Sequence, residues 1–310
     1  MSSNTFNRSL FAVVLSLTLA THAEAQSPVG IRANGMGGAF VGVADDGTAV
    51  YWNAAGLATG AFASVNFEYG ETKPDGPGDP PKMSHSLVAI SLPPVGLAYY
   101  RRGVFGERAL GPAVEDGQSR EDVGPSVQAF TASTFAISLL QSVTEYVVVA
   151  ATPKLVWGGE SFKVDVDASA MLALSHVRVG VTGRNLTTPS FALADDGIED
   201  VEQPMEVRMG GGWGSGWPGN SAVVVAVDGD VLTRPTLSGD RRDIAGGFET
   251  WVMKRRFGVR GGMRTSTVGE ARTVVTAGAS AMFSGMYLEG FWAGGHEDEQ
   301  SWGLGLRYSF

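Results

Sequence analysis

The feature of this sequence that most constrains its fold is an alternation of apolar and polar residues, repeated along most of the chain. In one segment Val177, Val179 and Val181 alternate with arginine, glycine and threonine, and charges collect on one face in the same way at 163–168 and 256–264. Successive side chains of a strand point to opposite faces. Each such segment is therefore predicted to be a strand with one aliphatic and one charged face.

Fourteen segments have this pattern or the composition of a strand. A soluble barrel of that size would enclose an apolar lumen too wide for side chains to fill. In lipid the faces exchange roles, so that aliphatic residues face outward and charges line the lumen. The predicted fold is therefore all-β, a 14-stranded antiparallel transmembrane β-barrel over 61–310, with strands at 61–70, 83–92, 94–105, 126–140, 144–157, 162–174, 177–186, 205–213, 220–228, 243–252, 255–264, 271–283, 286–293 and 300–310.

The connections between these strands alternate in length. Those after even-numbered strands are short, as at 141–143 and 284–285, whereas those after odd-numbered strands are mostly longer, as at 106–125 and 187–204. Outer-membrane barrels have short periplasmic turns and longer external loops. This alternation predicts a bacterial outer-membrane protein with both termini on the periplasmic side.

The two ends of the chain carry targeting and assembly signals. Residues 1–25 have the features of a secretory signal peptide, with Arg8, an apolar run and an A-x-A site at 23–25. The last strand has an outward stripe with aromatic residues at both ends, which resembles the assembly signal of outer-membrane barrels. We expect membrane lipid and the barrel assembly machinery as partners, the latter through Trp302, Tyr308 and Phe310.

Composition excludes several functions. The chain has no cysteine, which excludes disulfide scaffolds and thiol catalysis, and its net charge of −9 argues against nucleic acid as a partner. No apolar run after position 20 is long enough for a membrane-spanning helix. The histidines form no catalytic pattern with a nucleophile, and the acidic pairs of the loops are interpreted as solvated. The prediction is a protein that is not an enzyme, with no catalytic residues, no metal and no cofactor.

The segment before the first strand has a different character. Residues 26–60 combine a cluster of glycines with large aromatic residues, and disordered arms seldom carry so many aromatic residues. Asp46 is predicted to cap a short helix over 48–55 that ends at Gly56. We expect this segment to fold back as a hatch inside the lumen. Phe40, Tyr51 and Trp52 would be its anchors, and Asp45 and Asp46 would contact lumen arginines.

The motif GMGGAFVGVADDGTAVYWNAAGLA, residues 35–58, resembles the N-terminal signature of the FadL/TodX superfamily of hydrophobic-compound transporters, including its PorV/PorQ-like branch. The usual motif has proline where this chain has Ala54. The FadL resemblance implies passive uptake of long-chain fatty acids or aromatic compounds, gated by the hatch; the PorV branch implies a non-transporting partner or scaffold in a secretion or envelope complex. The ligand-binding or gating residues would be Gly35, Gly37, Gly38, Phe40, Asp45, Asp46, Trp52, Asn53 and Gly56.

One ion pair is predicted inside the lumen. If the strands on either side of Ser175-His176 form a hairpin, Asp167 lies opposite Arg184 on the charged face. An ion pair there would hold the shape of the barrel and constrict it. The many lumen arginines favour a local apolar pocket near the hatch over a continuous apolar channel.

Overall fold

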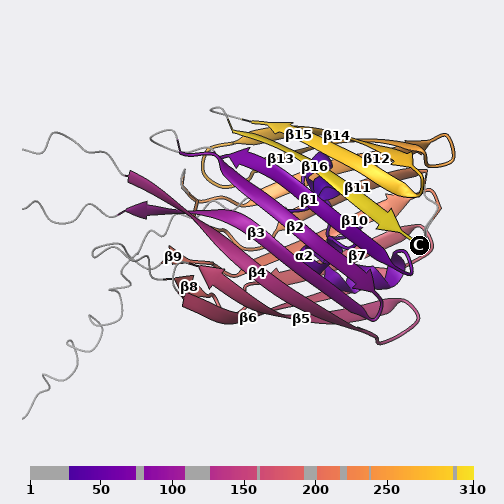
Figure 1. The fold of residues 1–310 in the computed structure, drawn as a ribbon, viewed down its shortest axis with the longest axis horizontal. Coiled ribbons are helices and arrows are strands. Elements are labelled where there is room, and N and C mark those ends of the chain that lie inside the picture. The colour runs from indigo at the N-terminus through magenta and orange to yellow at the C-terminus, as the bar shows by residue number, and fades with distance from the viewer. Residues whose placement is uncertain are drawn as a thin grey trace, which may run out of the picture.

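The computed structural model describes residues 28–74, 80–108, 126–158, 161–191, 201–216, 222–236, 239–295 and 299–310. The predicted signal peptide and the acidic pair Asp195-Asp196 lie outside the described residues. Fourteen antiparallel strands close into a barrel in the order β1-β16-β15-β14-β13-β12-β11-β10-β7-β6-β5-β4-β3-β2 (Figure 1). They are β1 (Ser64–Lys73), β2 (Met83–Leu92), β3 (Val95–Arg108), β4 (Ser126–Ser142), β5 (Val147–Gly158), β6 (Ser161–Ala173), β7 (Val177–Arg184), β10 (Glu206–Gly214), β11 (Val223–Asp230), β12 (Asp243–Val252), β13 (Phe257–Ser266), β14 (Thr273–Phe283), β15 (Met286–Gly294) and β16 (Gln300–Ser309).

The structure confirms the predicted fold class and the predicted number of barrel strands. The prediction succeeds because the alternation of apolar and polar residues marks each strand. The predicted loop at 187–204 contains two further strands, β8 (Ser190–Phe191) and β9 (Val201–Glu202), which pair as a small separate sheet. This sheet lies at one end of the barrel, and the C-terminus lies at the opposite end, beside the short turn at 284–285 (Figure 1). We call these the long-loop end and the short-turn end.

The two faces of the wall differ as the sequence predicts. In β16 the outward Leu304 and Leu306 are 57% and 46% exposed, whereas Arg307 is buried in the lumen. The predicted assembly residues Trp302, Tyr308 and Phe310 all lie on the outside and are exposed. Since barrels in lipid place apolar residues outward, this surface suits hydrocarbon. None of the helices in the described ranges is long and apolar enough to cross a membrane.

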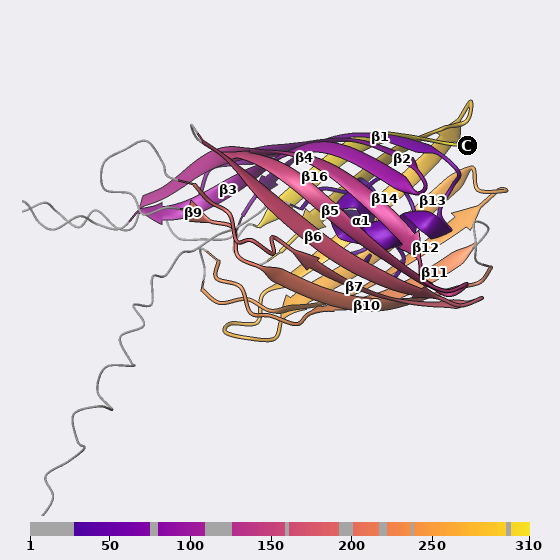
Figure 2. The ribbon, with the colours of Figure 1, turned by 90° about the horizontal axis from the view of Figure 1, so that it is seen from below.

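The N-terminal segment, residues 28–60, packs inside the barrel, and we call it the lumen segment. It comprises α1 (Ile31–Gly35), α2 (Ala49–Trp52) and the 3-10 helix η1 (Ala54–Thr59). Figure 2 shows α1 enclosed by the strands, nearer the short-turn end. Every residue from 29 to 57 except Asp45 is buried. The largest apolar core of the described chain lies between this segment and the wall, because the outer face of the wall has no protein to pack against.

The helix predicted over 48–55 is longer than the α-helix in the structure. The α-helix ends at Trp52, Asn53 is extended, and the chain continues as η1, in which the Asn53 side chain accepts a hydrogen bond from the N–H of Ala55. Gly56 lies inside η1 and does not end a helix. A Cβ on Gly56 would lie 2.0 Å from the carbonyl oxygen of Ala44, so the glycine permits close backbone packing.

Candidate functional site in the barrel lumen

The backbone of the lumen segment contacts the wall directly at glycines. Gly37 has a φ of 71°, and a Cβ there would lie 2.7 Å from the backbone nitrogen of Met263 in β13. A glycine of the wall is similarly close: a Cβ on Gly247 of β12 would lie 2.3 Å from the carbonyl oxygen of Met36. The fit leaves no room for a side chain between segment and wall at these points. Gly38 also has a positive φ, of 83°, whereas Gly35 packs against the Arg260 side chain.

An aromatic cluster anchors the segment. The rings of Phe40 and Trp52 pack edge to face at 6.1 Å, and Tyr51 contacts Trp52 and the wall residue Tyr100 at 5.6 Å in each case. The Trp52 indole donates a hydrogen bond to the carbonyl oxygen of Val29. The guanidinium of Arg184 lies 4.4 Å from the Tyr51 ring centroid. The structure therefore buries all three predicted aromatic anchors, Phe40, Tyr51 and Trp52, and it adds Tyr100.

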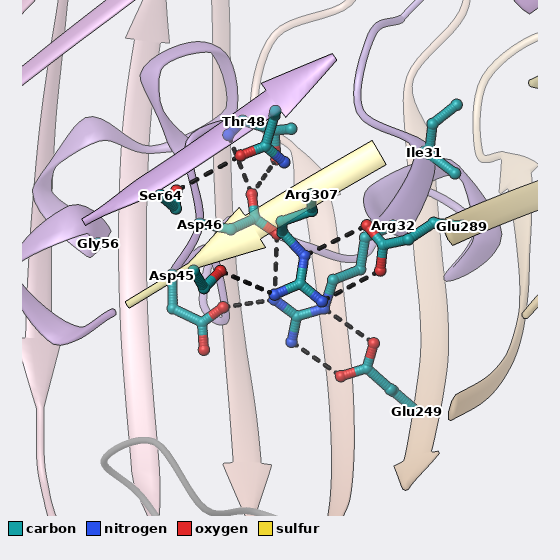
Figure 3. Close-up of polar contacts among 12 residues, drawn as sticks. Ile31, Arg32, Asp45, Asp46, Thr48, Gly56, Ser64, Glu249, Glu289 and Arg307 are labelled. Carbon is teal, nitrogen blue, oxygen red and sulfur yellow. Dashed lines mark hydrogen bonds and ion pairs between the residues drawn. The ribbon is translucent and has the colours of Figure 1, made fainter. Parts of the chain in front are cut away.

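A buried ion-pair network joins the segment to the wall (Figure 3). Arg32 donates two hydrogen bonds of 2.8 Å to the Glu249 carboxylate of β12 and also contacts Asp45 and Asp46. Glu249 lies 3.5 Å from Arg260. The network continues along the lumen face, where Glu289 pairs with Arg260 and Arg307.

The predicted contacts of Asp45 and Asp46 with lumen arginines are made mainly within the lumen segment itself. Asp45 lies 3.8 Å from Arg178 of β7, but the arginine both residues contact more closely is Arg32, within their own segment. Asp46 also accepts hydrogen bonds from the backbone and hydroxyl of Thr48. The two aspartates thus mainly fold the segment on itself.

Wall carboxylates also accept hydrogen bonds from the segment's backbone. Asp228 of β11 accepts from the N–H groups of Phe40 and Val41 at 2.7 Å, and Glu68 of β1 accepts from those of Gly30 and Ile31. Four residues of these contacts are not among those predicted from the sequence: Arg32, Glu68, Asp228 and Glu249. The sequence does place the three carboxylates at lumen-facing positions of strands. It does not show which part of the chain contacts them, because that part is distant in sequence.

Asn53 crosslinks two parts of the structure. Its side-chain amide donates to the carbonyl oxygen of Val41 at 2.9 Å and to that of Ala170 in β6 at 3.2 Å. The residue therefore ties η1 to another turn of the lumen segment and to the barrel wall.

The predicted ion pair between Asp167 and Arg184 is wrong, although the predicted register is correct. Ala168 lies opposite Gly183, as the hairpin requires. Within the described chain, however, Asp167 pairs with Lys154 of β5 at 2.6 Å, and Arg184 pairs with Glu206, its cross-strand neighbour on β10. Each side chain has an oppositely charged partner on its other neighbouring strand.

A second apolar cluster lies toward the long-loop end. Val104, Ala132 and Val201 pack together there, with Phe130 against them, and the Phe130 ring lies 6.3 Å from that of Phe191 in β8. Two polar residues, His85 and Gln203, are also buried, each with 1% exposure. Their side-chain nitrogen and oxygen atoms have no hydrogen-bond partner among the described residues. His85 lies in the wall, on β2.

The chemistry available in the lumen is binding and exclusion. In the described ranges, no group of three or more histidine or acidic side chains could hold a metal ion. The buried groups are paired carboxylates and guanidiniums, aromatic rings and closely packed glycines. Such an arrangement holds the lumen segment in place against the wall.

Barrel and lumen segment together define a class: a closed 14-stranded antiparallel β-barrel with an apolar outer face and an N-terminal segment packed inside. No protein-family model and no curated protein matches the sequence. Among solved structures, similar folds are found in a Pseudomonas aeruginosa FadL homologue and in channels and transporters of aromatic hydrocarbons. The chain is similar to the CymD monoaromatic hydrocarbon channel, with a TM-score of 0.63, 12% identity, and coverage of 91% of this chain and 97% of that one. It is also similar to the Ralstonia pickettii toluene transporter TbuX, with a TM-score of 0.61, 11% identity and coverage of 91% and 98%, and to the P. putida toluene transporter TodX, with a TM-score of 0.62, 10% identity and coverage of 91% and 98%. At this level of identity the likeness establishes the fold.

Proposed function

We propose that this protein is a bacterial outer-membrane barrel for the passive uptake of hydrophobic small molecules, such as aromatic compounds or long-chain fatty acids, and that the lumen segment gates the passage. The observation that carries the proposal is the combination of an apolar outer wall with a separate N-terminal segment packed inside the lumen. A water-filled porin channel has no need of such a segment. The similar folds of the toluene transporters and the hydrocarbon channel support the same ligand class.

The two ends of the lumen suggest a route. The apolar cluster around Phe130 and Phe191 offers a first contact for a hydrophobic ligand at the long-loop end. Beyond it lies the aromatic cluster around Tyr51 and Tyr100 at the edge of the lumen segment. Because Arg184 and Arg102 lie over the Tyr51 ring, the passage narrows there, and movement of the segment would open it.

The test combines uptake with conductance. Cells producing the full chain should take up labelled toluene or oleate faster than cells without it, and the purified protein should conduct few ions in planar bilayers. Deleting residues 28–58 should open an ion-conducting pore and abolish selective uptake. Ligand binding should quench the fluorescence of Trp52, and a Trp52→Phe variant separates this signal from the other six of the seven tryptophans.

Two outcomes would contradict the proposal. Full conductance after deletion, without toluene or oleate uptake or quenching in the intact protein, would favour a non-transporting barrel that serves as a scaffold. Absence of conductance after deletion would mean that wall side chains alone block the lumen, and gating by the segment would be refuted.

A further inference from the structure

The turn between β12 and β13 concentrates positive charge on an otherwise acidic protein. Lys254, Arg255 and Arg256 follow one another there, whereas the net charge of the whole chain is −9. In the other described turns of the short-turn end, Glu145 is the only side chain with a formal charge. The basic patch is therefore local and lies on one side of the barrel rim.

The backbone of this turn is unusual for its residues. Met253, Lys254 and Arg255 have φ values of 51°, 55° and 64°. This left-handed region is unfavourable for residues other than glycine, and asparagine or aspartate tolerates it better than lysine or arginine does. Residues that adopt such strained conformations are concentrated at functional sites.

The side chains of the turn divide into two groups. Arg255 turns back and stacks over the lumen-facing Trp251, with its guanidinium carbon 4.8 Å from the ring centroid. Lys254 and Arg256 are exposed, and Met253 is 71% exposed. One cation thus secures the turn to the wall, and the other two, with an apolar side chain beside them, are presented outward.

Exposed aromatic side chains border these cations. Phe257 follows the turn directly, and Phe283 lies at the end of the neighbouring β14, where the N–H of Met282 donates a 2.7 Å hydrogen bond to the carbonyl oxygen of Arg256. Phe283 is 79% exposed. Aromatic residues at the rim of a lipid-embedded barrel mark the membrane interface. Cations one to three residues beyond that level reach the depth of lipid phosphates.

We propose that Lys254 and Arg256 form a binding site for the phosphate groups of anionic phospholipids in the inner leaflet of the outer membrane. The charge is complementary, the bordering aromatic residues place the turn at the interface, and the exposed Met253 suits the acyl boundary. The inference rests on the membrane location in the proposed function and is independent of uptake.

The test is lipid retention by the full chain. Protein purified in mixed micelles with equal amounts of phosphatidylglycerol and phosphatidylcholine is released into native mass spectrometry, and each bound lipid is counted. The wild type should retain phosphatidylglycerol preferentially. A Lys254→Gln/Arg256→Gln variant should lose about tenfold in this preference, since each basic residue near an anionic surface contributes to attraction. Arg255 is kept, because it secures the turn.

The matched control removes the same number of exposed cations at the other end of the barrel. An Arg101→Gln/Lys163→Gln variant should keep the preference of the wild type. Equal retention of both lipids by the wild type, unchanged preference in the turn variant, or equal loss in the control would overturn the proposal. Binding of a polyglutamate peptide at the turn without lipid preference would assign it to a protein partner instead. Failure to insert into vesicles would refute the membrane location as well.

Discussion

Arg32 of the lumen segment and Glu249 of β12 are joined by two hydrogen bonds of 2.8 Å, although 217 positions separate them in the sequence. Both side chains are buried, at 5% and 0% exposure. Paired guanidinium and carboxylate groups fix orientation as well as distance. This contact therefore contributes to both the position and the orientation of the segment in the barrel.

Breaking this pair should destabilise the protein strongly. Arg32→Met leaves the Glu249 carboxylate buried with one cation fewer, and the loss of one member of a buried pair costs about 3–5 kcal/mol. We expect this decrease in the free energy of unfolding, measured by urea titration in detergent. Arg32→Met/Glu249→Met should lose less than the sum of the single variants, because the pair is coupled. Strictly additive losses would show that the two residues act independently.

Gly247 offers a test of the close fit between segment and wall. Gly247→Ala introduces a Cβ 2.3 Å from the carbonyl oxygen of Met36, so the segment must shift. We expect more frequent channel openings in planar bilayers and a lower unfolding temperature. The matched control is Gly246→Ala on the same strand, where an added Cβ meets nothing within 4 Å. If the two variants had the same channel openings and unfolding temperature, the close contact between Gly247 and Met36 would not hold the segment in place.

The barrel could be predicted from sequence because its determinants are local. Alternation marks each strand, and a short hairpin fixes register, as the opposition of Ala168 and Gly183 confirms. The ion partner of Arg184 could not be predicted in the same way. Glu206 follows a long loop, and the register across that loop is not set by a short turn.

The lumen segment shows a second limit of sequence analysis. Its aromatic and glycine residues indicate burial, but they do not mark the break between α2 and η1 at Asn53, nor the close approach of Gly56 to Ala44. The carboxylates that bind its backbone, such as Asp228, are distant in sequence. No local sequence pattern contains tertiary contacts of this kind. The sequence therefore predicts that the segment lies inside the barrel, but it does not predict the course of its backbone there.

Lys154 is expected to hold together two acidic residues of β6. It pairs with Asp165 and Asp167 at 2.7 and 2.6 Å, so Lys154→Met leaves two neighbouring carboxylates without their shared cation. We expect a loss of about 3–5 kcal/mol in unfolding free energy. A double-mutant cycle should find coupling between Lys154 and Asp167. The cycle between Asp167→Asn and Arg184→Gln should show a clearly smaller coupling, and the reverse ranking would restore the ion pair predicted from sequence.

Adjacent positions of β16 test which face meets lipid. Arg307 is buried in the lumen, where its guanidinium pairs with Glu289, whereas the preceding Leu306 is 46% exposed on the outer face. Leu306→Arg would place the same chemical group in the apolar surroundings of the membrane. Charged substitutions on the lipid face cost about 2–4 kcal/mol near the midplane of the bilayer. We expect a loss of this size for folding into phospholipid vesicles, measured by the gel shift between folded and boiled protein. Leu306→Phe, which keeps the face apolar, is the control and should fold as the wild type does. Full tolerance of arginine at 306 would mean that this face is in water, and the membrane orientation of the barrel would have to be abandoned.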